Sequence, residues 1–356
     1  DYPGAGVYCL GLRLGPRKRI EWLEAAARAA ERLKNRVVQG HHVGNLGLAY
    51  AALGDTGRAI PYYEQALAIS REVLATFPPS SPQWTVGRRA EGNSLGNLGN
   101  AHTSLGNTRQ AMAYYEEALA VSREILATAA PGAAEGQAAR RGGASRLGNL
   151  GSGYAALGEL QRAIEVHEQA LALARELQDR QGEAIHLGNL GSAYWSLGDA
   201  GRAGEYYRQA LAITREIGDR RNAGVHLGNL GNVAQALGEL SQAADCYRQG
   251  LALAREVGDR RGEGNRLANL AMIYAGTGEM QRAIDHYREA LAIARETGDR
   301  RAEESRLGYL GLAHADVGES RQAVACFEQA LAIARELGDR QAEGLLLANL
   351  ANACSD

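Results

Sequence analysis

Apolar residues recur along most of the chain at spacings of three and four, the period of an α-helix. Residues 182–220 illustrate the pattern, because they hold two such stretches separated by a short polar segment. The residues on the apolar faces of these two stretches are Leu187, Leu190, Gly191 and Tyr194, then Ala203, Tyr207, Ala210 and Leu211. Alternating β-branched runs, which would indicate strands, are absent from the sequence. The pattern therefore predicts an all-α fold built from helix-turn-helix units.

Both predicted turns of residues 182–220 carry a glycine followed by an acidic residue. Gly198-Asp199 separates the two helices of residues 182–220, and Gly218-Asp219 follows the second helix. Glycine adopts the left-handed conformation that commonly ends a helix, and aspartate is a favoured N-cap. The two dipeptides are therefore expected to end one helix and begin the next.

The unit repeats. The tetrad Gly-Asn-Leu-Gly, or a close variant, begins at residues 148, 188, 228, 268, 308 and 348, an interval of 40. Earlier copies begin at 44 and 96, so the first two intervals are 52 residues and contain 12 extra. The extra residues fall in 75–89 and 127–143, which hold four of the prolines, and we expect them to form loops.

The residues quoted for 182–220 resemble the tetratricopeptide repeat, whose pattern of Leu, Gly and Tyr followed by Ala and Tyr they match. The resemblance covers residues 17–356 and implies a right-handed superhelical α-solenoid. The 40-residue length with Leu-Gly-Asn resembles the repeats of kinesin light chain and of the Leu-Gly-Asn-rich cell-polarity adaptor. This sequence departs from the family at the closing proline, where it has arginine: Arg175, Arg215, Arg255, Arg295 and Arg335.

The repeat register predicts how the chain is organised. Residues 1–16 are expected to be a leader or junction from a longer protein. Residues 17–356 then form the array: half a repeat, seven full repeats and half a repeat. Leu345, Leu346 and Leu347 make the last helix too apolar for a solvent-facing cap, so we expect end-to-end self-association or a continuing array.

Asparagine recurs on one face of the first helix of each repeat. With the second glycine of the tetrad numbered position 8, positions 6 and 9 lie opposite the packing face. In the family this face resembles the lining of the concave groove, and an amide can pair with the backbone of an extended peptide. The predicted peptide-binding residues are Asn45, Asn97, Asn149, Asn189, Asn229, Asn269 and Asn349 at position 6, and Asn100 and Asn232 at position 9. The alternative is that each amide bonds to the neighbouring helix and only fixes the stacking.

Position 3, at the flank of this face, carries cationic or titratable side chains. They are Arg146, His186, His226, Arg266 and Arg306. In register they would favour acidic groups of a ligand. The alternative is a solvated edge that pairs with Glu183, Glu263 and Glu303.

The amino-acid composition argues against several classes of function. Lys and Arg number 39 against 41 Asp and Glu, so no basic surface indicates nucleic acid or membrane partners. The four cysteines are scattered, so neither a disulfide framework nor a metal site is expected, and a cytoplasmic location is the default. No acid/base or nucleophile constellation appears, so we expect neither an enzyme nor a cofactor. The 45 glycines occupy turns and close helix contacts rather than a flexible chain.

The leader suggests a setting for the array. Residues 2–26 resemble the junction between the nucleotide-binding half and the repeats of bacterial STAND-type (NB-ARC or NACHT) signalling ATPases. That resemblance implies a sensor arm that binds a protein or peptide ligand. A stand-alone adaptor without an attached ATPase is the alternative.

Overall fold

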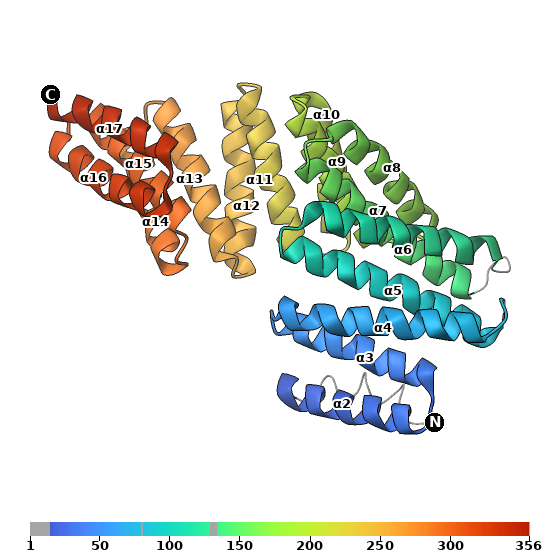
Figure 1. Ribbon diagram of the computed structural model, residues 1–356. Helices are drawn as coiled ribbons and strands as arrows, with labels where there is room; N and C mark the ends of the chain where they lie inside the picture. Colours follow the sequence, from blue (N-terminus) through green and yellow to red (C-terminus); the bar gives the residue numbers. More distant parts are fainter. Residues whose placement is uncertain (1–14, 80, 129–133, 356) are drawn as a thin grey trace. The chain divides into compact units, whose positions relative to one another are not determined.

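The computed structural model describes residues 15–79, 81–128 and 134–355, and in this part of the chain every regular element is an α-helix (Figure 1). Residues 1–14 of the predicted leader lie outside the described residues, and the first described helix, α2, begins at Pro16. The helices are α2 (Pro16–Arg32), α3 (Arg36–Ala52), α4 (Thr56–Thr76), α5 (Pro82–Ser104), α6 (Thr108–Thr128), α7 (Ala134–Ala156), α8 (Leu160–Glu176), α9 (Arg180–Ser196), α10 (Ala200–Glu216), α11 (Arg220–Ala236), α12 (Leu240–Glu256), α13 (Arg260–Gly276), α14 (Met280–Glu296), α15 (Arg300–Asp316), α16 (Ser320–Leu337) and α17 (Arg340–Ser355).

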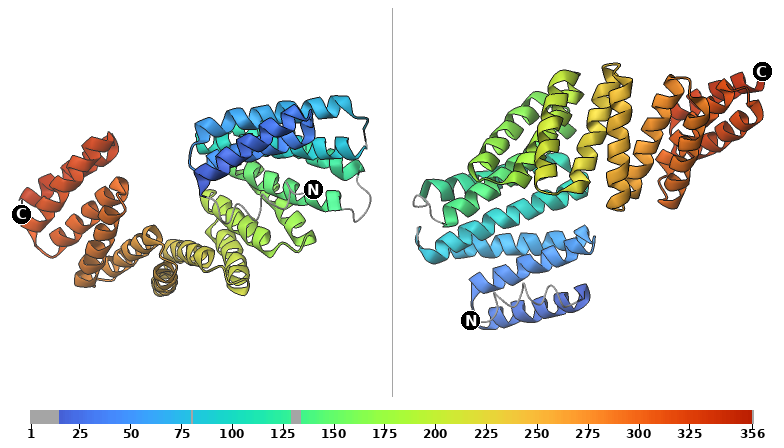
Figure 2. Two further views of the ribbon diagram at one scale, coloured as in Figure 1. Left: turned by 90° about the horizontal axis from the view of Figure 1, so that it is seen from below. Right: turned by 180° about the vertical axis from the view of Figure 1, so that it is seen from behind.

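The chain divides into two compact units, Asp1–Ala193 and Tyr194–Asp356, and the boundary falls inside α9. Within each unit, helices adjacent in sequence pack side by side as hairpins, as α3 does with α4 and α11 with α12 (Figure 2). The odd-numbered helices from α3 onward carry the Leu-Gly-Asn pattern and are called first helices below. The even-numbered helices are the second helices. The all-α prediction is confirmed, and each unit is a stack of helix-turn-helix repeats.

The turns have the predicted geometry. Gly198 has φ 83° and Gly218 has φ 74°, both in the left-handed region. The side chain of Asp199 accepts a hydrogen bond from the backbone N–H of Arg202 at 2.9 Å, and Asp219 caps α11 in the same way. Two of the described turns depart from the pattern, because Lys34 adopts φ 52° and Gln178 adopts φ 54° where other repeats have glycine.

The prediction that residues 75–89 and 127–143 are loops is wrong for most of their length. Helix α4 continues to Thr76 and α5 already begins at Pro82, while α7 begins at Ala134. Residues 129–133 lie outside the described part. The extra residues mainly lengthen helices, since α5 and α7 have 23 residues where α9 and α11 have 17. Proline is tolerated in a first helical turn, and Ser81 caps α5 by accepting from Trp84 N at 3.2 Å.

Aromatic side chains of the second helices pack on glycine in the first. A Cβ added at Gly47 would lie 2.5 Å from the Tyr63 ring, and one at Gly311 would lie 2.6 Å from the Phe327 ring. His167 occupies the same place over Gly151 and is only 2% exposed. The aromatic residues thus fill the space that glycine leaves open, and the repeat packs closely because of it.

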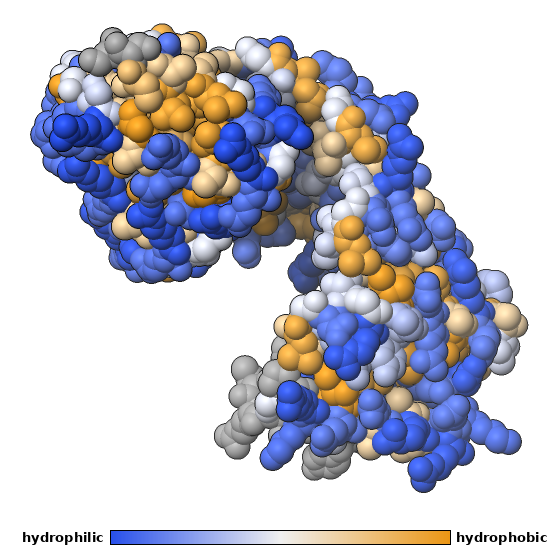
Figure 3. Space-filling view, turned by 60° about the vertical axis from the view of Figure 1, so that its left-hand side comes forward, coloured by the Kyte–Doolittle hydropathy of each residue, from blue (hydrophilic) through white to orange (hydrophobic). Residues whose placement is uncertain are grey.

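The visible surface carries hydrophilic side chains with hydrophobic patches between them (Figure 3). Exposed apolar residues include the leucines that precede the turn glycines, such as Leu53 and Leu237, and Leu345 on α17. No described helix is both long and apolar enough to cross a membrane.

Candidate functional site

The predicted position-6 asparagines share one environment. Each is half-buried on its first helix, neither in the core nor fully in solvent: Asn45 on α3, Asn97 on α5, Asn149 on α7, Asn189 on α9, Asn229 on α11, Asn269 on α13 and Asn349 on α17. The position-9 residues Asn100 and Asn232 are exposed. Within each unit, the sequence pattern therefore identified a row of amides accessible from solvent.

Hydrogen bonds connect these amides between repeats. Asn149 Nδ2 donates to Asn100 Oδ1 at 3.1 Å, and the hydroxyl of Tyr115 donates to the same oxygen at 2.7 Å. The second unit repeats this arrangement. There Asn269 Nδ2 donates to Asn232 Oδ1 at 3.3 Å and the Tyr247 hydroxyl donates at 2.8 Å. The position-9 carbonyl oxygens thus hold the stack together, as the alternative interpretation expected.

Not every amide is used in this way. Among the described residues, the side chain of Asn189 has no hydrogen-bond partner, and Asn149 is bonded only through its Nδ2. An amide carries donors and an acceptor at once, so both side chains retain groups that a ligand can bind.

These two asparagines line one pocket of about 430 Å³ between α7 and α9. His186, from the predicted flank, lines it as well, so the structure brings together members of both predicted sets. Arg141 and Asp179 add one charge of each sign. The remaining lining residues are Ala144, Ser145, Gly148, Ser152, Gln181, Gly182 and Ile185. The pocket therefore combines polar and apolar groups on the first-helix face of the first unit.

The position-3 arginines lie between successive first helices. Arg146 Nη2 donates to the carbonyl oxygen of Gly92 at 2.8 Å. Arg266 Nη2 donates to Gly224 O at 3.2 Å, in the same register. Burial lowers the pKa of all three position-3 arginines, Arg146, Arg266 and Arg306. These side chains join one repeat to the next, and their recognition of an acidic ligand stays a prediction.

The two histidines at position 3 are buried. Among the described residues, neither His186 Nδ1 nor His226 Nδ1 has a hydrogen-bond partner. Burial lowers the pKa of both imidazoles, although Asp179 and Asp219 act in the opposite direction. Both rings are therefore neutral at pH 7 and do not present the cationic groups that the sequence suggested.

The alternative pairing of position 3 with glutamates is wrong, because those glutamates bind other arginines. Glu263 Oε1 accepts from Arg255 Nε at 2.8 Å, and its Oε2 accepts from Arg260 Nη1 at 2.5 Å. Glu183 is held likewise by Arg175 and Arg180. Burial raises the pKa of Glu183, but the two arginines outweigh it and leave a net lowering. Four of the five arginines in place of the family's closing proline thus bind a carboxylate of the next repeat: Arg175, Arg255, Arg295 and Arg335.

These Arg-Glu-Arg clusters were not predicted from the sequence, although the sequence carries a signal for them. The first arginine precedes the glutamate by eight residues and the second by three, as in Arg295, Arg300 and Glu303. That spacing crosses a turn, so helical periodicity alone does not link the residues.

A second pocket of the first unit, about 380 Å³, lies among α3, α4 and α5. Val38, Ile69 and Val73 line it, together with His41 and His42. Among the described residues, no three His, Cys, Asp or Glu side chains are grouped to hold a metal ion.

Helix-turn-helix units stacked in register, with a polar face on the first helices, define an α-solenoid repeat protein. Models of the tetratricopeptide repeat match residues 43–80, 92–128, 144–216, 222–296 and 307–341. The chain belongs to the tetratricopeptide-repeat family. A search of curated proteins finds no match to the sequence.

Solved structures with a similar fold come from proteins of different kinds. BtubC (BKLC) from P. vanneervenii is 20% identical with TM-score 0.56, over 68% of this chain and 92% of that one. A STAND protein with a tetratricopeptide repeat sensor from Pyrococcus horikoshii is 14% identical with TM-score 0.65, over 95% of this chain. This chain spans 48% of that protein's length. The Rap conjugation gene regulator of plasmid pLS20, in complex with the Phr* peptide, is 16% identical with TM-score 0.51, over 88% of this chain and 80% of that one.

Proposed function

We propose that this chain is a non-catalytic scaffold that binds an extended segment of a protein or peptide along its first-helix face. The observation that carries the proposal is the pocket between α7 and α9, where Asn149 and Asn189 retain unused amide groups. An extended backbone offers an N–H and a C=O at each residue, and an amide can bind both. The row of amides suits a ligand recognised through its main chain.

Fold-level comparison supports this proposal. The Rap regulator was solved with its Phr* peptide bound, so a stack of this architecture can hold a peptide. At 16% identity the likeness concerns the fold, and the contacts in this chain are argued from its own asparagines.

The scaffold is further proposed to be the ligand-sensing arm of a larger regulatory protein. The likeness to a STAND protein with a repeat sensor supports this, since the present chain spans 48% of that protein. A stand-alone adaptor is the alternative. The gene sequence upstream of Asp1 separates the two, because an attached ATPase requires a Gly-x-x-x-x-Gly-Lys-Ser/Thr loop for nucleotide phosphates.

The test begins with the chain as bait, to recover its partner and map the bound segment as a synthetic peptide. Asn149→Ala/Asn189→Ala is expected to weaken peptide binding tenfold or more while circular dichroism shows an unchanged fold. The matched control removes two exposed amides from a second helix, Gln161→Ala/Gln169→Ala on α8, and should bind normally. Equal affinity for both double variants would show that the first-helix amides are structural only.

We further propose that the ligand carries acidic groups and that the position-3 arginines bind them. Arg266→Glu/Arg306→Glu is expected to lower the affinity for an acidic peptide more than the affinity for its amidated analogue. Because both side chains bond to the preceding repeat, thermal unfolding must be compared in the same experiment. A loss of affinity that is equal for both peptides would assign these arginines to stacking alone.

Self-association through the last helix is likewise a proposal. On α17, Leu345 is 65% exposed and Leu347 is 43% exposed. Leu345→Ser/Leu347→Ser should shift sedimentation from dimer to monomer if these residues form an end-to-end contact. A wild-type chain that sediments as a monomer at high concentration would rule the contact out.

A further inference from the structure

The repeats contain a recurring site for one carboxylate. An arginine near the end of a second helix and an arginine at the start of the next first helix hold a single glutamate between them. In the second unit, Arg295 Nε donates to Glu303 at 2.9 Å and Arg300 Nη1 donates at 2.6 Å. The glutamate is buried, whereas the side chains of Arg295 and Arg300 are 49% and 41% exposed. Equivalent clusters form around Glu91, Glu183, Glu263 and Glu343.

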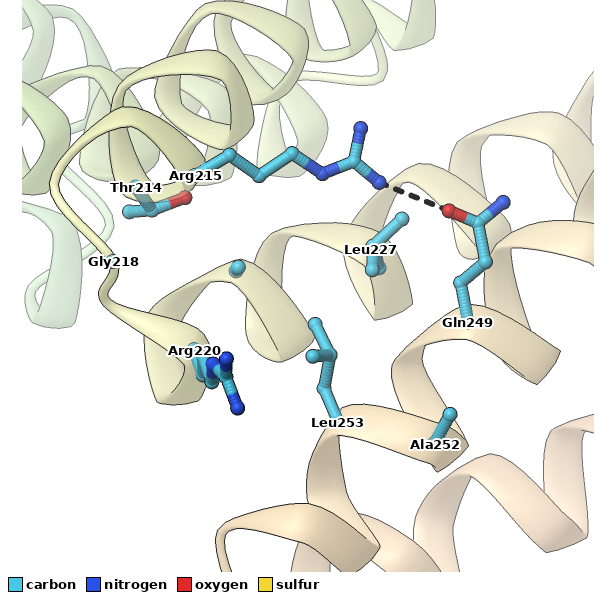
Figure 4. Close-up of a pocket in the computed structure, with 9 residues that line it drawn as sticks. Thr214, Arg215, Gly218, Arg220, Leu227, Gln249, Ala252 and Leu253 are labelled. Atoms are coloured by element: carbon cyan, nitrogen blue, oxygen red, sulfur yellow. Dashed lines mark hydrogen bonds between the residues drawn. The ribbon is translucent and has the colours of Figure 1, made fainter.

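The junction between α10 and α11 has both arginines but no glutamate. Arg215 and Arg220 occupy the two arginine positions, and Ala223 stands where the other repeats have glutamate. Arg220 keeps its other partner, Glu256, just as Arg260 keeps Glu296. Arg215 Nη2 donates to Gln249 Oε1 at 2.9 Å (Figure 4). Each arginine has therefore lost only the shared carboxylate.

Two other repeats also lack this glutamate. Gln39 takes its place in the first repeat and accepts from Arg36 Nη1 at 2.8 Å, so an acceptor is still supplied there. Gly143 takes its place on α7, where Arg123 and Arg140 occupy the two arginine positions, so this junction lacks the carboxylate as well. Ala223 differs from Gln39 because its methyl group offers no acceptor, and it is only 2% exposed, so the missing carboxylate would be at a covered position.

A pocket of about 430 Å³ lies at this junction. Arg215 and Arg220 line it, with Leu227 and Leu253 forming apolar walls (Figure 4). Within the described part of the chain, no acidic side chain lines it; the other lining residues are Thr214, Gly218, Ala223, Gln249 and Ala252. The pocket thus combines two guanidinium groups with aliphatic side chains, and Glu256, which pairs with Arg220, is not among its lining residues.

We propose that this pocket binds a carboxylate carried on a short aliphatic chain, with its oxygens taking the place of the absent glutamate carboxylate. The five repeats that keep the glutamate supply the supporting geometry, because the equivalent pair of arginines binds one carboxylate in each of them. Guanidinium–carboxylate hydrogen bonds are charge-assisted and geometrically specific. The site is distinct from the first-helix amides, so it does not depend on the peptide-binding proposal. A free organic acid and a glutamate side chain of a bound protein offer the same chemistry.

The test uses sodium propionate, which has the atoms of a glutamate side chain beyond Cα, on the full chain. Thermal unfolding is followed with propionate, with neutral propionamide and with sodium chloride at equal ionic strength. At tenfold excess over its dissociation constant, propionate should raise Tm by about 2 °C above the chloride control. Ala223→Glu should itself raise Tm and abolish the response to propionate. An equal response from wild type and Ala223→Glu would overturn the proposal.

Glu263→Ala provides the matched variant, because it creates the same vacancy at α12–α13. It should lower Tm and gain a second, additive response to propionate. If it gains none, paired arginines do not suffice to bind a carboxylate and the proposal fails. Hexanoate and the peptide acetyl-Gly-Glu-Gly-amide then distinguish the sources. Tighter binding of hexanoate indicates a free apolar acid, tighter binding of the peptide indicates a protein side chain, and binding of neither overturns the site.

Discussion

The guanidinium group of Arg266 lies against Gly228 of the preceding repeat, so closely that a Cβ on this glycine would fall well inside van der Waals contact with it. His186 is similarly placed over Gly148, where an added Cβ would lie 2.8 Å from the imidazole Cε1. The first glycine of the tetrad is therefore a recess for the position-3 side chain of the next repeat. At Gly308, by contrast, a Cβ would meet only Leu346 Cδ2 at 3.6 Å.

Gly228→Ala is expected to destabilise the chain by about 1–3 kcal/mol, although alanine is the better helix former. The added methyl must displace Arg266 and break its hydrogen bond to Gly224 O. Urea unfolding followed by circular dichroism measures the change. Gly308→Ala, at the same register position, should be neutral or stabilising by up to about 1 kcal/mol. Equal destabilisation by both substitutions would refute the steric explanation.

Stability should fall as the pH drops from 6.5 toward 4. Burial, aided by repulsion from His186, lowers the pKa of His167 to about 4, below the 6.5 of an unfolded histidine. Between these values the unfolded state binds more protons, so the stabilisation is complete above pH 6.5 and is lost as the pH falls. The His167 contribution lost between pH 7.5 and 5 is about 2 kcal/mol. His42, His186 and His226 act in the same direction, since burial lowers their pKa values too.

His167→Phe is the variant for this prediction, because Phe327 fills the equivalent place over Gly311. It should reduce the difference in unfolding free energy between pH 7.5 and 5 by about 2 kcal/mol. A pH dependence equal in wild type and His167→Phe would rule out His167 as the titrating group.

Gln178→Gly is expected to stabilise the chain by about 1 kcal/mol. Gln178 has φ 54°, a conformation that costs a residue with a Cβ about 1–2 kcal/mol and costs glycine little. The reciprocal variant, Gly218→Gln, places glutamine at φ 74° and should destabilise by a similar amount. Chemical unfolding of the two variants gives both values, and a stabilising Gly218→Gln would contradict the argument.

The amides at positions 6 and 9 should differ in their effect on stability. Asn232→Ala removes the acceptor for Tyr247 and Asn269 and should cost about 0.5–1.5 kcal/mol. Asn229→Ala removes no inter-repeat bond among the described residues and should stay within about 0.5 kcal/mol of wild type. Urea unfolding of both variants checks the assignment. A larger loss for Asn229→Ala than for Asn232→Ala would reverse it.

The repeat pattern predicted the helices and turns well because both depend on local chemistry. The period of three and four residues identifies the helices, and Gly198-Asp199 identifies a turn through its left-handed glycine and its N-cap. The inserted residues were interpreted wrongly, because Pro82 was taken as a loop signal and instead occupies the first turn of α5. A proline at that point is compatible with either structure, and only packing against neighbouring helices decides between them.

By itself the sequence determined the fold class, the register of the repeats and the half-exposed row of asparagines, since each follows from spacing along one helix. The tertiary structure decided what those side chains bind. Arg266 bonds to the previous repeat and Glu263 bonds to Arg255 and Arg260, because stacking brings together residues on different helices. The tertiary structure also showed that, with alanine at position 223, Arg215 and Arg220 line a pocket without the glutamate carboxylate of other repeats. Contacts between repeats depend on how helices are placed in space, which the periodicity of one helix does not specify.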